Sequence, residues 1–255
     1  FGSKKCKYIS RIGSIISSQI SDLGFVKGFI MSFYQRVLNF SDIIITQSKS
    51  MDEDLKKYIN KKSEVIYNPI SLNKIISLAK EKISIKLDSN YYNIISVGRL
   101  AYEKDYKTAI LSIAKLKKRY GNIKYYILGD GELKNELYKY SDYLDLKNDI
   151  IFTGYLSNPY PIMKNANVLL STSLYEGFSN VILESLALNV PVVATDCPGG
   201  NKEIISNEKN GFLAKVGNTE DIVDKLMLVK KQKDYNIDVS KFKINFIAKE
   251  YEKHF

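Results

Sequence analysis

Residues 168–196 read VLLSTSLYEGFSNVILESLALNVPVVATD, and this stretch predicts a strand, a helix and a second strand in succession. The short apolar runs at 168–173 and 190–196 are typical of strands buried on both faces. Between them, apolar residues recur at helical spacing over 180–188. Elements of these lengths in this order predict a βαβ unit with two parallel strands.

The same alternation extends in both directions, from Tyr91 to Lys231. Further strands are expected at 93–98, 124–129, 150–154 and 211–216, and further helices at 106–120, 132–144, 161–165, 202–206 and 220–231. Strands and helices that alternate in this way form a parallel sheet covered on both faces, with right-handed crossovers. The predicted fold class is therefore α/β, with a Rossmann-like parallel sheet and helices on both faces.

The first 72 residues follow a less regular pattern. One clear strand is expected at 42–46, then a helix at 51–58 and a short strand at 64–67. The Asn68-Pro69 pair that follows is typical of a turn or a linker. We therefore expect a separate region before the regular part of the chain.

The composition is that of a globular protein, and its positive charge suggests an anionic partner. The chain has 255 residues, of which 45% are hydrophobic, and a formal net charge of +10. Such a charge favours a phosphorylated molecule, a nucleic acid or an anionic membrane, although it is equally consistent with a lysine-rich surface. Cys6 and Cys197 are far apart and lack metal-ligand spacing, which argues against a zinc site and fits a reducing compartment. No run approaches the roughly 18 apolar residues of a membrane span.

Polar residues and glycines follow the expected strands. Because ligands bind beyond the carboxyl ends of such strands, these residues form a candidate binding edge. Arg99 and Lys104 follow the first regular strand and together suit a diphosphate. The helix that begins near Asn180 offers free backbone amides to phosphate, and Glu176 and Glu184 suit sugar hydroxyls. Taken singly, the two cations could be surface charges, and Glu184 could be a carboxylate favoured by the helix dipole.

The segment 96–216 resembles the C-terminal domain of glycosyltransferase family 4, which has a GT-B fold. The resemblance rests on several motifs in order, namely VGRL with EKD (97–105), LGDG (128–131), GY (154–155) with NPY (158–160), SLYEGFSNVILE (173–184), VPVVAT (190–195) and NGFL (210–213). Glu176 and Glu184 have the E-x7-E spacing of such transferases. The segment 41–69 resembles, more loosely, the end of the family's N-terminal domain and its linker.

This resemblance implies an organisation for the whole chain. Residues 1–72 would be the remnant of an N-terminal, acceptor-side Rossmann-like domain, with residues 73–238 as the nucleotide-sugar-binding domain. Residues 239–255 would form a helix that returns to the N-terminal domain. The family's early glycine-rich loop has no counterpart here, so the chain is expected to be N-terminally truncated and incomplete for catalysis.

The resemblance also implies residue roles. Arg99, Lys104 and Glu176 would be catalytic, the two cations by stabilising charge on the leaving diphosphate and Glu176 by contacting the donor sugar. The donor would be bound by Gly98, Gly129, Tyr155, Leu156, Gly177, Phe178, Ser179, Asn180, Val181 and Glu184. Among these, the backbone near Tyr155 and Leu156 would bind the base, and Glu184 the ribose hydroxyls.

The expected reaction is transfer of a hexose from a UDP-sugar, with retention of configuration, to a glycan or lipid-linked acceptor in bacterial cell-envelope synthesis. No cofactor, metal or nucleic-acid partner is expected. The expected location is cytoplasmic, at the inner face of the membrane, with peripheral membrane contact. Two departures from the family pattern are that no histidine lies in 9–14 and that Asn189 stands where glycine is usual. His254, the only histidine, is expected to be a frayed surface residue.

Two alternatives remain open. The chain could be a module that binds the donor without catalysis, or an unrelated Rossmann-like NAD-binding protein. The absence of G-x-G-x-x-G after the first regular strand disfavours the second alternative. The tyrosines and lysines are not arranged as a nucleic-acid stacking platform with a basic groove.

Overall fold

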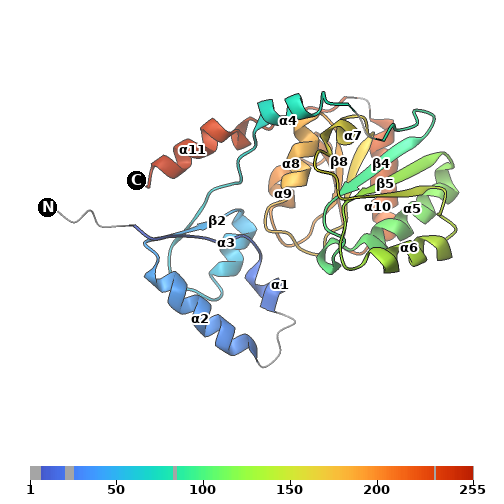
Figure 1. Cartoon of the computed structure of the whole chain (residues 1–255). Coiled ribbons are helices and arrows are strands. Elements are labelled where there is room, and N and C mark those ends of the chain that lie inside the picture. Colours follow the sequence, from blue (N-terminus) through green and yellow to red (C-terminus); the bar gives the residue numbers. More distant parts are fainter. Residues whose placement is uncertain (1–6, 21–25, 83–84, 233, 255) are drawn as a thin grey trace.

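The chain folds around two parallel sheets. A computed structural model describes residues 7–20, 26–82, 85–232 and 234–254 (Figure 1). The smaller sheet has the strand order β1-β2-β3 and the larger one the order β6-β5-β4-β7-β8-β9. All strand pairs within both sheets are parallel.

The larger sheet confirms the expected fold class. Its strands are β4 (Tyr92–Val97), β5 (Ile123–Leu128), β6 (Ile150–Gly154), β7 (Val168–Ser171), β8 (Val192–Thr195) and β9 (Gly211–Ala214). The chain first proceeds outward from β4 to β6, then crosses back and proceeds from β7 to β9. The direction of winding therefore reverses between β4 and β7, which is where doubly wound sheets bind ligands.

Both faces of this sheet are covered by helices, because each strand is apolar on both sides. Ile94 packs into one core with α5 (Tyr106–Tyr120), α6 (Lys134–Tyr143) and α10 (Thr219–Lys231). Ile95, its neighbour, points to the other face and packs with α4 (Leu72–Leu78), α7 (Tyr160–Lys164), α8 (Asn180–Ala187) and α9 (Asn201–Ile204). Successive strand residues point to opposite faces, so the continuous apolar runs build two cores at once. Within these described helices and strands, the predicted bounds hold to within about two residues.

The smaller sheet is only partly as expected. The predicted strands appear as β2 (Ile43–Thr46) and β3 (Ser63–Val65), and the predicted helix as α3 (Lys49–Leu55). The sequence prediction lacks β1 (Ile9–Arg11), α1 (Ile16–Ile20) and α2 (Lys27–Phe40). β1 is too short for a periodic signal, and α2 leaves much of its apolar surface exposed, so its pattern does not show a buried stripe. Cys6 lies outside the described residues.

The C-terminal helix α11 (Ile244–Glu252) lies beside the smaller sheet. Ile247 packs against Ile45 and Ile66 beside the smaller sheet, and Figure 1 shows α11 extending away from the larger sheet. The His254 imidazole lies 3.0 Å from Glu64 and its side chain is 12% exposed, so the expectation of a frayed residue was wrong. The reason is that α11 brings the chain end back onto β3. The domain boundaries at 72 and 238 stay predictions.

Two further features concern single elements. Asn189 has a φ of 61°, the left-handed conformation expected where glycine is usual. In the described part of the chain, every helix is too short or too polar to cross a bilayer.

Candidate functional site

A small crevice opens at the carboxyl ends of β4 and β7, where the winding direction reverses. Its lining includes Val97 from β4, Lys104 and Tyr106 after it, and Glu176 and Val181 beyond β7. Residues from both halves of the sheet therefore meet at the position that the topology favours for a ligand.

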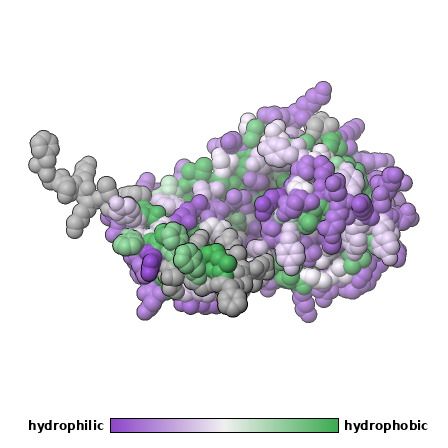
Figure 2. Space-filling model, turned by 60° about the horizontal axis from the view of Figure 1, so that its bottom comes forward, coloured by the Kyte–Doolittle hydropathy of each residue, from purple (hydrophilic) through white to green (hydrophobic). Residues whose placement is uncertain are grey.

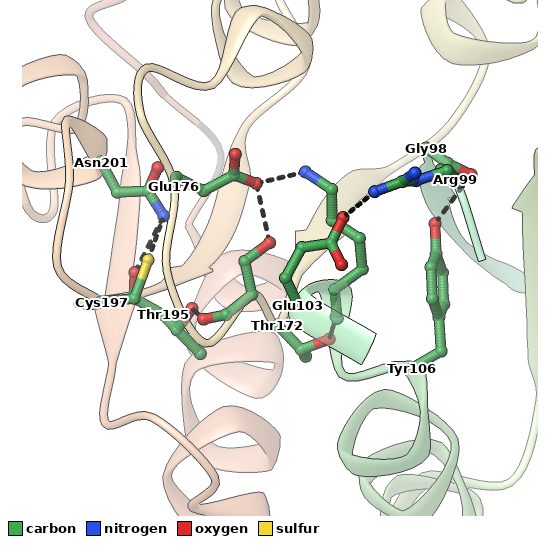
Figure 3. Close-up of polar contacts among 11 residues, drawn as sticks. Gly98, Arg99, Glu103, Tyr106, Thr172, Glu176, Thr195, Cys197 and Asn201 are labelled. Atoms are coloured by element: carbon green, nitrogen blue, oxygen red, sulfur yellow. Dashed lines mark hydrogen bonds and ion pairs between the residues drawn. The ribbon is translucent and has the colours of Figure 1, made fainter. Parts of the chain in front are cut away.

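The centre of the crevice is an ion pair between two predicted catalytic residues. Lys104 Nζ lies 2.6 Å from Glu176 Oε1, and the Ser173 hydroxyl donates to the same oxygen at 2.8 Å (Figure 3). The Lys104 side chain is 25% exposed and that of Glu176 is 11% exposed. An ammonium and a carboxylate are thus held together near the protein surface, where both side chains are partly exposed.

Hydroxyl groups fix the backbone on both sides of this pair. Thr172 Oγ1 donates to the carbonyl oxygens of Lys104 at 2.9 Å and of Asp105 at 3.0 Å. Thr195 Oγ1 donates to the Ser173 carbonyl oxygen at 2.6 Å (Figure 3). Asp105 has a φ of 45° and its carboxylate caps α5. These bonds tie the loop after β4 to the loop after β7 and so set where the Lys104 and Glu176 side chains meet.

Arg99 lies apart from this pair. Its Nη2 donates to Glu103 Oε1 at 2.8 Å, and its side chain is 66% exposed. Arg99 and Lys104 are therefore bound to two different carboxylates, those of Glu103 and Glu176. The expectation that both cations act on one diphosphate stays a prediction.

At two positions around the crevice, another backbone segment comes so close that only glycine fits. A Cβ on Gly129 would overlap the carbonyl oxygen of Gly98. A Cβ on Gly177 would overlap the carbonyl oxygen of Gly13, which belongs to the loop after β1. These glycines therefore allow the strand ends, and the two sheets, to approach closely.

The start of α8 faces the same crevice. The buried residues Gly177, Phe178 and Ser179 lead into α8, and Val181 lines the crevice. The Ser179 hydroxyl is buried and has no hydrogen-bond partner among the described residues. Because the first backbone amides of a helix lack acceptors within it, this end of α8 favours an anion.

Glu184 follows one turn later on α8. Its Oε1 accepts a hydrogen bond from the Tyr160 hydroxyl at 3.2 Å, and burial raises the pKa of the Glu184 carboxyl. Tyr155 is exposed, whereas Leu156 packs against the core that contains α8. The structure thus groups Glu184 with Tyr160, while Lys104 and Glu176 form a separate cluster.

Residues from the smaller sheet also reach this region. Asn68 Nδ2 donates to Asn180 Oδ1 at 2.8 Å, and the Arg11 guanidinium donates to Asn68 Oδ1. Sequence reasoning singled out neither side chain as a site residue. These contacts depend on how the two sheets pack, so the sequence contains no direct signal for them. The position of Asn68 in the predicted linker was the one feature that could have drawn attention to it.

A second contact between the two sheets involves Glu203 on α9. Its carboxylate accepts from the Lys49 amide at 2.9 and 3.1 Å and from the Tyr67 hydroxyl at 3.0 Å. Burial and the nearby Glu203 charge raise the pKa of Tyr67 to about 12. The Gly199 amide donates to Ser50 Oγ at 3.1 Å. These contacts join the sheets beside the crevice.

Comparisons with known proteins all indicate the same family. The family described as glycosyl transferases, group 1, matches residues 79–245. A glycosyltransferase of Methanocaldococcus jannaschii is 34% identical over 73% of this chain and 48% of its own length. A Campylobacter jejuni protein, N-acetylgalactosamine-N,N'-diacetylbacillosaminyl-diphospho-undecaprenol 4-alpha-N-acetylgalactosaminyltransferase, is 37% identical over 70% of this chain and 48% of its own length. The chain thus spans about half the length of these curated relatives.

Solved structures share the fold. A mutant of TarM from S. aureus, solved in a complex that includes UDP, superposes with a TM-score of 0.81 at 19% identity, over 99% of this chain and 51% of that one. At this level of identity the likeness concerns the fold alone.

Proposed function

The chain belongs to the group 1 glycosyltransferases and has their GT-B fold, and we propose that it supplies the donor site for transfer of a hexose from a UDP-sugar. The observation that carries the proposal is the Lys104–Glu176 pair at the sheet's switch point, 2.6 Å apart and beside the first amides of α8. A cation, an anion-binding helix end and a carboxylate at one place match a sugar linked to a diphosphate.

The proposed binding mode assigns each group to one part of the donor. The amides of Asn180 and Val181 and the cations Lys104 and Arg99 hold the diphosphate. Glu176 accepts hydrogen bonds from the donor sugar. The Ser179 hydroxyl, which is buried without a partner among the described residues, supports this mode because a donor oxygen would satisfy it.

The nucleoside lies further along α8 in this mode. Glu184 accepts hydrogen bonds from the ribose hydroxyls, and the backbone around Tyr155 and Leu156 binds the uracil. The exposure of Tyr155 and the contact of Glu184 with Tyr160, at the start of α7, support a ligand at this end of the site.

In the proposed reaction, the bond between the anomeric carbon and the diphosphate oxygen breaks, and its electron pair stays with UDP. Lys104 and Arg99 stabilise the negative charge that develops there, without a metal. The acceptor oxygen bonds to the same face of the sugar, so configuration is retained. Its proton passes to a donor phosphate oxygen.

We place the acceptor in cell-envelope synthesis, as a glycan or a lipid-linked sugar. The name of the C. jejuni relative includes a diphospho-undecaprenol substrate, which supports this class of acceptor. Peripheral contact with the inner face of the membrane is part of the proposal. The net charge of +10 favours anionic headgroups. Figure 2 shows apolar side chains gathered over the part that carries α2, whose exposed residues are Phe29, Phe33, Val37 and Phe40.

The test of the donor site is calorimetric titration of this chain with UDP, with NAD as the comparison ligand. We expect saturable UDP binding that weakens in Lys104→Met and in Glu184→Ala. Matched controls are Lys107→Met and Glu136→Gln, whose side chains pair with each other on α5 and α6 and are about half exposed. Binding of NAD in place of UDP, or equal UDP affinity in all four variants, would show that the assignment is wrong.

A further inference from the structure

A second, larger groove lies at the opposite edge of the six-stranded sheet. It has a volume of about 650 Å³ and lies where β4, β5, β7 and β8 begin, with Tyr92, Asn122, Asn167 and Pro191 among its lining residues. β4 has six residues, so the two edges are separated by about 20 Å at roughly 3.3 Å per residue. This groove is therefore separate from the crevice at Lys104.

Tyrosines form the walls of this groove. Tyr91, Tyr120 and Tyr235 line it, and Lys124 lies over one face of the Tyr91 ring, with its Nζ 4.8 Å from the ring centroid. Tyr235 is fixed by a hydrogen bond from its hydroxyl to the Val229 carbonyl oxygen at 2.9 Å. Tyr120 is fixed from one side by Lys230, whose Nζ lies 3.6 Å from the ring centroid. Rigid aromatic faces of this kind suit the C–H face of a pyranose ring.

Side-chain amides line the same groove. The side chains of Asn90, Asn122 and Asn189 make no hydrogen bond to any residue in 7–20, 26–82, 85–232 or 234–254. Each amide carries both a donor and an acceptor, which matches neighbouring hydroxyl groups on one sugar. Most polar groups in this lining are thus available to a ligand with many hydroxyls.

An adjoining groove of about 370 Å³ extends the first one. The two grooves are neighbours, because both are lined by Ser89, Tyr91 and Asn167. Asn93 lines the extension and is only 3% exposed; its Nδ2 donates to two backbone carbonyls, but its Oδ1 has no partner among the described residues. A buried acceptor without a hydrogen-bond partner is unfavourable, and a ligand hydroxyl that donates to it would remove this penalty.

The charged residues that line the two grooves also restrict which ligands can bind there. The two linings contain Lys86 and Lys230 and no carboxylate. A cationic ligand would therefore find no counter-charge, whereas a neutral or acidic one is accepted. The combined volume is in the range of pockets that take ligands larger than a single sugar.

We propose that these two adjoining grooves form a second carbohydrate site, which binds an oligosaccharide segment of the glycan acceptor or product. The inference rests on the proposed function in one respect, that the glycan is the one on which the transferase acts. A chain of several sugars could occupy this site while another part of it lies at the donor site.

The experiment is calorimetric titration of this chain with three oligosaccharide probes: chitopentaose, maltopentaose and a hyaluronan hexasaccharide. We expect saturable binding of at least one probe, with a Kd of about 1 mM or below. Binding of that probe should weaken about tenfold in the double variant Asn90→Ala/Asn122→Ala, which is the effect of losing a few hydrogen bonds. Both asparagines are exposed, so the fold should be retained.

The controls separate this inference from the donor-site proposal. Asn148→Ala, an exposed asparagine outside the groove, should bind the probe as the parent does. UDP affinity should be unchanged in the double variant. Absence of binding for all three probes in a folded chain would overturn the inference, as would binding that is insensitive to the double variant or that UDP abolishes by competition. Failure to bind UDP while a probe still binds would count against the donor site alone.

Discussion

Replacing Lys104 with methionine and Glu176 with glutamine, singly and together, measures how strongly the central ion pair is coupled. Methionine preserves most of the lysine's length and removes its charge, so Glu176 would keep only the hydrogen bond from Ser173. At the 2.6 Å separation and an effective dielectric of about 20, the gross attraction is about 6 kcal/mol. Desolvation offsets most of this attraction, and breaking a fully buried pair typically costs about 3–5 kcal/mol.

The side chains here retain 25% and 11% exposure, so we expect each single change to lower the free energy of unfolding by about 2 kcal/mol. The double change should cost less than the sum of the two single changes, with a coupling of about 1–2 kcal/mol. Urea denaturation followed by far-ultraviolet circular dichroism is the suitable assay, because the chain has no tryptophan.

The matched control is the same cycle at Lys107 and Glu136, a pair that is about half exposed on both sides. Exposed pairs are screened by solvent, so we expect little coupling in that cycle. A coupling at Lys104 and Glu176 no larger than that of the control would refute the view that the crevice holds a desolvated ion pair.

Three further predictions concern residues around the crevice. Burial raises the pKa of Glu184, so the stability of the parent protein falls as pH rises from the usual carboxyl range through the raised value. Glu184→Gln should therefore have a higher Tm than the parent at about pH 7, with a smaller difference at about pH 4, while UDP binding weakens; an equal difference at both pH values would contradict this. Gly177→Ala should lower stability by about 1–3 kcal/mol in urea denaturation, because its Cβ would push against the Gly13 carbonyl oxygen. Gly13→Ala is its control, since a Cβ there finds its nearest neighbour at 3.7 Å, and similar losses in both would count against the steric argument. Thr172→Val should cost about 1–3 kcal/mol by leaving the Lys104 carbonyl without its donor, whereas Thr172→Ser should retain most of the stability; a valine variant as stable as the serine variant would contradict this.

The strands and helices of the larger sheet could be predicted from the sequence, as could the residues that follow each strand. Strands buried on both faces need continuous apolar runs, and the helices between them need a periodic stripe, so both leave strong local signals. Remaining differences are local: the strand expected from residue 190 begins at Val192, after Pro191, which has no amide hydrogen for a sheet hydrogen bond. The first part of the chain was less predictable, because β1 has three residues and several apolar side chains of α2 are exposed, among them Phe29, Phe33 and Phe40.

Which side chains meet could not be predicted from the sequence, because their contacts form only in the folded chain. The sequence placed Arg99 and Lys104 together, but the fold pairs Lys104 with a residue 72 positions away and leaves Arg99 with Glu103. Glu203 reaches the amide of Lys49 across 154 positions, and the groove beside Tyr91 gathers loops from four strands. The physical reason is that local periodicity depends on residues a few positions apart, whereas these contacts depend on strand order and on how the two sheets pack, which no local pattern records.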